Sequence, residues 1–227
     1  MEKIEKQYPV MPLKNTVLFP QQVIPIYVGR KKSLQLIEDL DPDNKYLVVV
    51  AQQDGSVEDP KEEDLYSYGT LALVLKTFDM PDNSKSAIVQ GVDRVKILKY
   101  QKDGPYFIAD VERIPESIAS PDVQVDALAK SLKNSFTELI KISPNLNEEH
   151  AGMLSNIDRP SRLADRATSL LSVSNSEKQE VLEELDIKKR VENAINLLQK
   201  EIQRIKLGEE IQTEVQDEIS KTQESTI

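Results

Sequence analysis

The sequence changes composition near residue 115, and this change constrains the fold more than any other feature. Ten of the eleven aromatic residues lie before residue 108, and nine of the twelve prolines lie at or before Pro115. The β-branched runs also lie in this first part, whereas the second is rich in Leu, Glu, Lys and Gln. Aromatic and β-branched residues favour strands, and the second set favours helices. The 227 residues therefore predict a β-rich part and then an all-helical part, with a boundary at 115–121.

The β-rich part is predicted to contain five or six short strands and one small helix. The strands are expected at residues 16–19, 23–28, 46–51, 70–79, 85–100 and 106–114. Pro25 has no N–H, so its strand is expected to lie at an edge or to carry a bulge. Ser33 is expected to cap a helix over residues 34–40. Short strands with this punctuation predict a compact, partly closed sheet or barrel.

The second part is predicted to contain four helices and then one long helix. Pro121 is expected at the first position of the first of these helices. Its apolar residues then recur at steps of three and four, which is typical of a helix with one buried face. They are Val125, Leu128, Leu132, Phe136, Leu139 and Ile140. Asn147, Ser176 with Gln179, and Asp186 are expected to cap later helices.

The long helix is expected to run from Asp186 to about Ser220 and to carry two apolar stripes. The first is a heptad seam of Val191, Ile195, Leu198, Ile202 and Ile205. This seam can pack inside the chain or between copies of it. The second stripe, out of register with the first, is Leu207, Ile211, Val215 and Ile219. The last 19 residues carry half of the net charge of −10, and this end is expected to project.

Several classes of function are excluded by what the sequence lacks. It has no Cys and only one His, His150, which removes thiolate chemistry, disulfides and His-pair metal sites. No Gly is followed by Lys, so there is no phosphate-binding loop. The negative charge opposes broad nucleic-acid binding, and the longest apolar run, residues 46–51, is too short to span a membrane. We expect a cytoplasmic protein without catalytic, cofactor-binding or metal-binding residues.

Short strings along residues 9–223 resemble one protein family, in the same order. They are residues 11–20 (MPLKNTVLFP), 23–30 (VIPIYVGR), Ser33, residues 50–52, Gly69, Thr70, residues 89–91, Arg94, Asp158, Pro160, residues 163–165, residues 178–183, Asp186, Arg190, Ile211, Gln212 and residues 220–223. Together they resemble the N-terminal region of the ATP-dependent Lon protease family. One departure is Ser161, where the family usually has Gly.

The resemblance implies an α+β fold in three segments. Residues 1–117 would form a β-rich, PUA-like subdomain with a partly closed barrel, and residues 118–185 a helical bundle. Residues 186–227 would form a long projecting helix that leads toward an AAA+ ATPase module, which this sequence does not contain. ATP and Mg²⁺ are expected only in that module. The chain is then expected to be either truncated or a natural short relative.

The resemblance also implies a function, namely a non-catalytic domain for substrate recognition and oligomerisation in an ATP-dependent Lon serine protease. Its partners would be unfolded or damaged proteins and further copies of the chain, which form a hexamer in the full-length family. Candidate substrate contacts are the basic turn Arg30, Lys31 and Lys32 and the apolar tip Phe78 and Met80. The alternatives are a solvated turn that balances neighbouring acids, and a tip that packs on its own hairpin.

Two other functions remain open from the sequence. The first is a stand-alone scaffold or adaptor that oligomerises through the long helix without capturing substrates. The second is RNA binding, because RNA-binding modules share the PUA-like fold, although fold does not carry function. A net charge of −10 and the lack of a basic, aromatic surface oppose the second.

Overall fold

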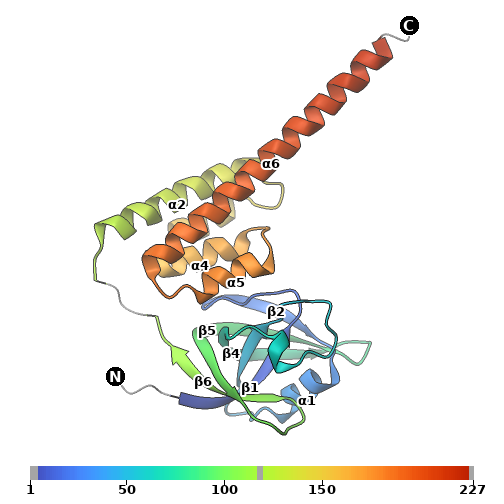
Figure 1. Ribbon diagram of the computed structural model, residues 1–227, viewed down its shortest axis with the longest axis vertical. Coiled ribbons are helices and arrows are strands. Elements are labelled where there is room, and N and C mark those ends of the chain that lie inside the picture. The colour runs from blue at the N-terminus through green and yellow to red at the C-terminus, as the bar shows by residue number, and fades with distance from the viewer. Residues whose placement is uncertain (1–4, 117–119, 225–227) are drawn as a thin grey trace. The chain divides into compact units, whose positions relative to one another are not determined.

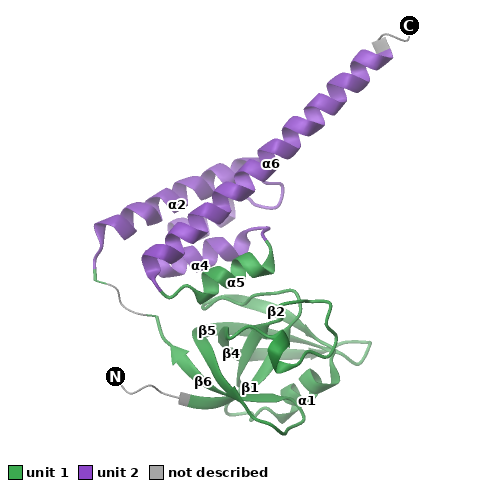
Figure 2. Ribbon diagram, viewed as in Figure 1, with its two compact units in different colours: residues 1–120, 174–185 green, residues 121–173, 186–227 purple. Residues whose placement is uncertain are grey.

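The structure, a computed structural model, describes residues 5–116 and 120–224 (Figure 1). Their contacts divide the chain into two compact units (Figure 2). Unit 1 comprises residues 1–120 and 174–185, and unit 2 comprises residues 121–173 and 186–227. The predicted α+β class is confirmed. The expected boundary between residues 117 and 118 lies outside the described residues, and the segment 174–185 groups with the strands rather than with the helical bundle.

Unit 1 is built on a six-stranded sheet that closes on itself. Its strands are β1 (Glu5–Leu13), β2 (Val23–Val28), β3 (Tyr46–Ala51), β4 (Tyr68–Asp79), β5 (Lys85–Tyr100) and β6 (Phe107–Ile114). The order is β2-β5-β4-β3-β1-β6, and β5 also pairs with β6. Only β1 and β3 run parallel among these pairs. The second half of β5 closes the barrel, while its first half pairs with β2, so the expected edge position of Pro25 is confirmed.

The first strand differs from the prediction. Residues 16–19 are not a strand. The first strand is β1, which precedes them and is absent from the prediction. It contains Pro9 and Pro12, and prolines inside a run argue against a strand. Pro9 pairs only with β6 and Pro12 only with β3, so each proline lies where β1 has one neighbour. Residues 16–19 are held instead by side chains, since the Thr70 hydroxyl donates to the Leu18 carbonyl at 2.6 Å.

The apolar core of unit 1 lies on both faces of β3. Leu47 and Val49 belong to one buried cluster, and Val48 and Val50 to another. Successive side chains of a strand point to opposite faces, so a continuous apolar run marks a strand that is covered on both sides. The run at residues 46–51 is therefore a core strand.

Two helices of unit 1 begin differently from the prediction. Helix α1 (Lys31–Asp39) starts after Arg30, which makes no side-chain cap, and Ser33 lies inside its first turn. The predicted cap at Ser33 is wrong because the helix begins two residues before that residue. Helix α5 (Asn175–Glu183) is capped by Ser174, whose hydroxyl accepts from the Glu177 N–H at 3.2 Å. The capping box predicted at Ser176 is wrong, since its helix also starts earlier.

Helix α5 belongs to unit 1 through buried polar contacts. Arg94 of β5 is 6% exposed, and its Nε donates to the Leu182 carbonyl at 2.7 Å. Gln179 Nε2 donates to the Tyr68 carbonyl at 3.0 Å. Val181 and Leu182 are buried as well. These contacts tie a segment that follows residue 173 back to strands that end before residue 101. Unit 1 also contains a short 3-10 turn, Glu62–Asp64.

Unit 2 is a helical bundle. Its helices are α2 (Val123–Ile142), α3 (Glu148–Ser155), α4 (Pro160–Leu170) and α6 (Ile187–Glu224). Asp122 caps α2, with its carboxylate accepting from the Gln124 N–H at 2.8 Å, so Pro121 precedes the helix instead of opening it. The predicted caps Asn147 and Asp186 are confirmed, since both side chains accept from N–H groups of the next turn.

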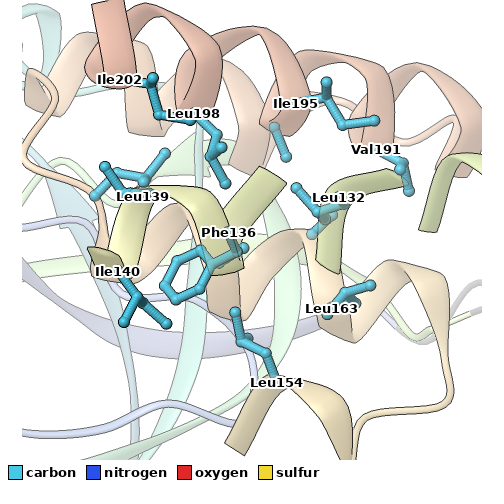
Figure 3. Close-up of a cluster of buried hydrophobic side chains, with 14 residues drawn as sticks. Leu132, Phe136, Leu139, Ile140, Leu154, Leu163, Val191, Ile195, Leu198 and Ile202 are labelled. Carbon is cyan, nitrogen blue, oxygen red and sulfur yellow. The ribbon is translucent and has the colours of Figure 1, made fainter. Parts of the chain in front are cut away.

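The heptad seam of α6 is core in unit 2. Val191, Ile195, Leu198 and Ile202 are buried, and Ile205 packs partly buried against them. They meet the buried face of α2 predicted from the sequence, and Figure 3 shows Leu132, Phe136 and Leu139 below them. Of the two arrangements left open for this seam, the structure shows packing inside the chain.

The second stripe of α6 lies on an exposed length of helix. Residues 206–223 are all exposed, and Leu207, Ile211, Val215 and Ile219 each expose between 51% and 58% of their surface. The predicted projection of this end from the bundle is confirmed. Two apolar stripes of one helix therefore have different environments.

Replacing Arg94 by alanine is expected to lower the free energy of unfolding of unit 1 by about 1–3 kcal/mol, because buried carbonyls of α5 lose their donor. Arg113→Ala is the control, since its ion pair with Asp93 is partly exposed and worth less than about 1 kcal/mol. Urea unfolding followed by tyrosine fluorescence measures this, because all seven tyrosines lie at or before Tyr106. Equal losses for both variants would contradict the anchoring of α5 by Arg94.

Leu198→Ala and Leu207→Ala form a matched pair on the two stripes of α6. The first is expected to cost about 2–5 kcal/mol, because it opens a cavity in the core, and the second less than about 1 kcal/mol. Thermal unfolding followed by circular dichroism at low protein concentration measures both. A comparable loss at Leu207 would show that the second stripe is also buried within a single chain.

Candidate functional site

The hairpin of β4 and β5, together with β2, carries an exposed face. Residues that pair directly across a sheet lie on the same face, which gives three rows across these strands. The rows are Val23, Gln90 and Leu73; Pro25, Ile88 and Lys76; and Tyr27, Ser86 and Phe78. The opposite face is buried by residues of the rows between them, such as Ile26 with Ala87. One side of this three-stranded layer is therefore core, and the other is surface.

Large apolar side chains gather on that surface. Tyr27 is 70% exposed, Phe78 43% and Met80 42%, and Val23 is about as exposed as they are. Leu75 is also exposed, at the register shift between Val74 and Lys76. We call Val23, Tyr27, Phe78 and Met80 the apolar patch. The structure thus places the predicted tip residue Phe78 in the same row as Tyr27, with Val23 two rows further along the same face, and sequence reasoning missed Tyr27 and Val23.

The alternation of apolar residues along β2 could have identified Val23 and Tyr27 as exposed side chains. Val23, Pro25 and Tyr27 are exposed, whereas Ile26 and Val28 are buried. An edge strand with apolar residues on both faces points to a surface that serves binding, since such strands otherwise tend to aggregate. The prediction used Pro25 only to place the strand.

The turn at the tip is held rigid by hydrogen bonds. The Met80 N–H donates to the Ser84 carbonyl at 2.9 Å, and Asn83 has a positive φ of 64°. The Tyr27 hydroxyl donates to the Asp82 carboxylate at 3.2 Å, and this bond helps to lower the pKa of Asp82, after the larger effect of Ser84. Tyr27 is thereby tied to the turn that carries Met80.

Lys76 places a positive charge beside the apolar patch. Its Nζ lies 4.8 Å from the centroid of the Phe78 ring, a cation–π geometry. The apolar stem of the lysine can cover part of the ring while the charge stays in water. The Phe78 ring therefore lies at the surface rather than folding onto its own hairpin core.

The predicted basic turn is matched by acids of the loop 52–61. Lys32 Nζ lies 2.8 Å from Asp59, and the hydrogen bond from this lysine lowers the pKa of the Asp59 carboxyl. Arg30 donates to Gln52, and partial burial lowers its pKa while Glu58 and Asp59 act in the opposite direction. Lys31 is exposed. The charge of these three residues is thus partly neutralised by neighbouring acids, as the first alternative for this turn expected.

Two adjoining hollows open beside this turn. The first, of about 360 Å³, is lined by Val10, Pro12, Arg30, Lys31, Lys32, Ser33, Leu36, Glu58, Asp59, Pro60, Tyr106 and Phe107. The second, of about 510 Å³, is lined by residues 11–16, residues 25–27, Gly29, Arg30, Ser33 and Glu58. They share Pro12, Arg30, Ser33 and Glu58.

No cluster that could hold a metal ion occurs among residues 5–116 and 120–224. Within the same ranges no helix is both long enough and apolar enough to cross a membrane. His150 serves the local structure, because its Nδ1 accepts from the Asn147 N–H at 3.1 Å in a capping box. His150 thus has a structural role at the start of α3.

The sequence matches the family model described as the ATP-dependent protease La (LON) substrate-binding domain over residues 7–200. It is 39% identical to a Lon protease of Koribacter versatilis over 216 residues, which cover 95% of this chain and 26% of that protein. It is 35% identical to a Lon protease of Dictyoglomus thermophilum over 222 residues, which cover 98% of this chain and 28% of that protein. The chain thus spans about a quarter of the length of these relatives.

Solved structures share the fold. The N-terminal domain of the Mycobacterium avium complex Lon protease superposes with a TM-score of 0.70 at 22% identity, covering 86% of this chain and 98% of that one. A Lon N-terminal domain protein from Xanthomonas campestris gives 0.61 at 19% identity, covering 84% and 98%. With the family match over residues 7–200, these likenesses confirm the resemblance found in the sequence: the chain belongs to the Lon substrate-binding domain family.

Proposed function

We propose that this chain is the non-catalytic substrate-recognition domain of an ATP-dependent Lon serine protease. It captures unfolded or damaged proteins, and the ATPase and protease modules of the full-length protein degrade them. The apolar patch of Val23, Tyr27, Phe78 and Met80 is the observation that carries this proposal. ATP and Mg²⁺ act in the ATPase module and are not required by the residues described here.

The chemistry of the patch suits unfolded chains. An unfolded segment presents apolar side chains without a fixed shape, so its receptor needs exposed apolar area and little strict complementarity. Met80 is flexible and polarisable, and Phe78 and Tyr27 supply large ring surfaces. A rigid sheet holds these side chains, so binding does not require ordering of the receptor.

We further propose that copies of the chain associate through α6. The seam of Val191 to Ile205 is already used inside unit 2, which leaves the second stripe for contacts with another copy. Leu207, Ile211, Val215 and Ile219 follow one another at steps of four, as expected for one helix face. This stripe is also the observation that favours the second candidate function, a scaffold that oligomerises without capturing substrates.

The double variant Phe78→Ser/Met80→Ser is expected to bind a permanently unfolded protein about tenfold more weakly than the unchanged chain does, because apolar area leaves the contact. The measurement is fluorescence anisotropy with a labelled, reduced and carboxymethylated protein. Leu98→Ser is the matched control, since Leu98 is exposed to the same 43% as Phe78 but lies outside the patch. Equal affinities of the double variant and the unchanged chain would contradict capture by the patch.

The proposed association through α6 is tested by light scattering over a concentration series. The full chain is expected to form a larger species than residues 1–206, because the shorter chain lacks the exposed stripe. A scaffold without capture predicts the same difference together with no binding of the unfolded protein. Identical masses for both chains would contradict association through the stripe.

A further inference from the structure

The exposed end of α6 has an internal symmetry about Ile211. Successive residues of an α-helix are about 100° apart, so positions four or seven residues away in either direction lie within about 40° of Ile211. Leu207 and Val215 occupy the positions four residues away. Arg204 and Glu218 occupy the positions seven residues away. These five residues therefore share one face of α6.

This face has an apolar centre and opposite charges at its two ends. Its three apolar residues each expose more than half of their surface. The side chain of Arg204 is 63% exposed, and its guanidinium lies 4.0 Å from Glu201, one turn back on the same helix. Glu218 is exposed as well, about 21 Å further along the axis. The cation thus stands at the N-terminal end of the face and the anion at its C-terminal end.

The order of these charges selects one orientation for a second copy of the chain. In an antiparallel pair with Ile211 on the two-fold axis, Arg204 of each copy faces Glu218 of the other. A parallel pair in register would instead place arginine against arginine and glutamate against glutamate, which is unfavourable. A two-fold interface must be complementary to itself, and only the antiparallel arrangement of this face is.

Gly208 fits a close contact at the margin of the same face. Glycine inside a helix is unfavourable relative to alanine. Among the described residues, a Cβ at Gly208 would meet no atom within 4 Å, so packing inside the chain does not require a glycine here. The residue lies about 60° from Ile211, where the lack of a side chain allows the backbone of another helix to approach.

We propose that two copies of this chain pair antiparallel through α6, with Ile211 on the two-fold axis. Leu207 of each copy packs on Val215 of the other, and Arg204 pairs with Glu218 at both ends of the contact. This inference rests on the proposed association through α6, to which it adds the orientation and the register of the two helices.

Disulfide trapping tests the orientation, because the sequence contains no Cys and an introduced pair reports on this contact alone. The variants Leu207→Cys and Val215→Cys are oxidised separately and as an equal mixture, and the products are identified by mass spectrometry. A disulfide requires Cα atoms within about 7 Å. The product that joins one copy of each variant is expected to exceed the two self-linked products at least fivefold. Self-linking as efficient as mixed linking would indicate a parallel pair and overturn the proposal.

Charge reversal tests the register. Glu218→Arg is expected to weaken association about tenfold at low salt, because both ion pairs of the dimer become repulsive. Adding Arg204→Glu is expected to restore the affinity, since the exchanged charges again face each other in an antiparallel pair and would not in a parallel one. Glu209→Arg is the control, because it makes the same charge change about 160° from Ile211.

Sedimentation equilibrium measures these affinities, and failure of Arg204→Glu to restore association would overturn the register. The trapping experiment leaves both charges unchanged, so it decides the orientation even where a carboxylate near Glu201 weakens the fold.

The outcomes separate this inference from the proposed association. Equal masses of the full chain and residues 1–206 in light scattering would overturn the association and the antiparallel pair together. A larger mass for the full chain with predominantly self-linked products would keep the association through α6 and overturn the antiparallel pair alone.

Discussion

Arg94 ties the end of α5 to the strands of unit 1 and so joins distant parts of the sequence. Its buried guanidinium donates to the carbonyl of Leu182, 88 residues further along the chain. A buried charge of this kind needs several acceptors, and main-chain carbonyls at the end of α5 provide them. The chain therefore leaves unit 1 near residue 120, returns at residue 174 and leaves again at residue 185. A fragment that ends before α5 would retain all six strands and expose the surface on which α5 packs.

The exposure of the apolar patch follows from the length of β5. The second half of β5 pairs with β6 and closes the barrel. The first half extends beyond this closure and pairs with β2 and β4. A sheet segment beyond a closed barrel has one face without a covering layer, so any apolar side chain there meets solvent. The patch is thus a consequence of topology, and the turn that joins Met80 to Ser84 fixes its outer end.

The sequence predicted elements where one local rule dominates and failed where two rules compete. Pro25 predicted an edge strand because it has no N–H to donate to a second neighbour. Asp186 predicted the start of α6 because a helix cap depends only on the residues beside it. β1 was missed because Pro9 and Pro12 are acceptable only where a neighbour is absent, which no local pattern reveals. Phe78 and Met80 stood out as an apolar tip, whereas Tyr27 joins them only through the register of β2 with β5. The placement of α5 depends on Arg94, a contact between distant segments that spacing cannot encode.

Net charge is a poor guide to binding in this chain because its charges are segregated. Half of the −10 lies in the last 19 residues, and the exposed part of α6 within the described residues carries most of it. Screening at physiological salt limits the reach of surface charge to about 8 Å. The electrostatic potential near a surface residue of unit 1 therefore depends on the charges close to it, such as those of Lys32 and Asp59, and not on the sum over the chain.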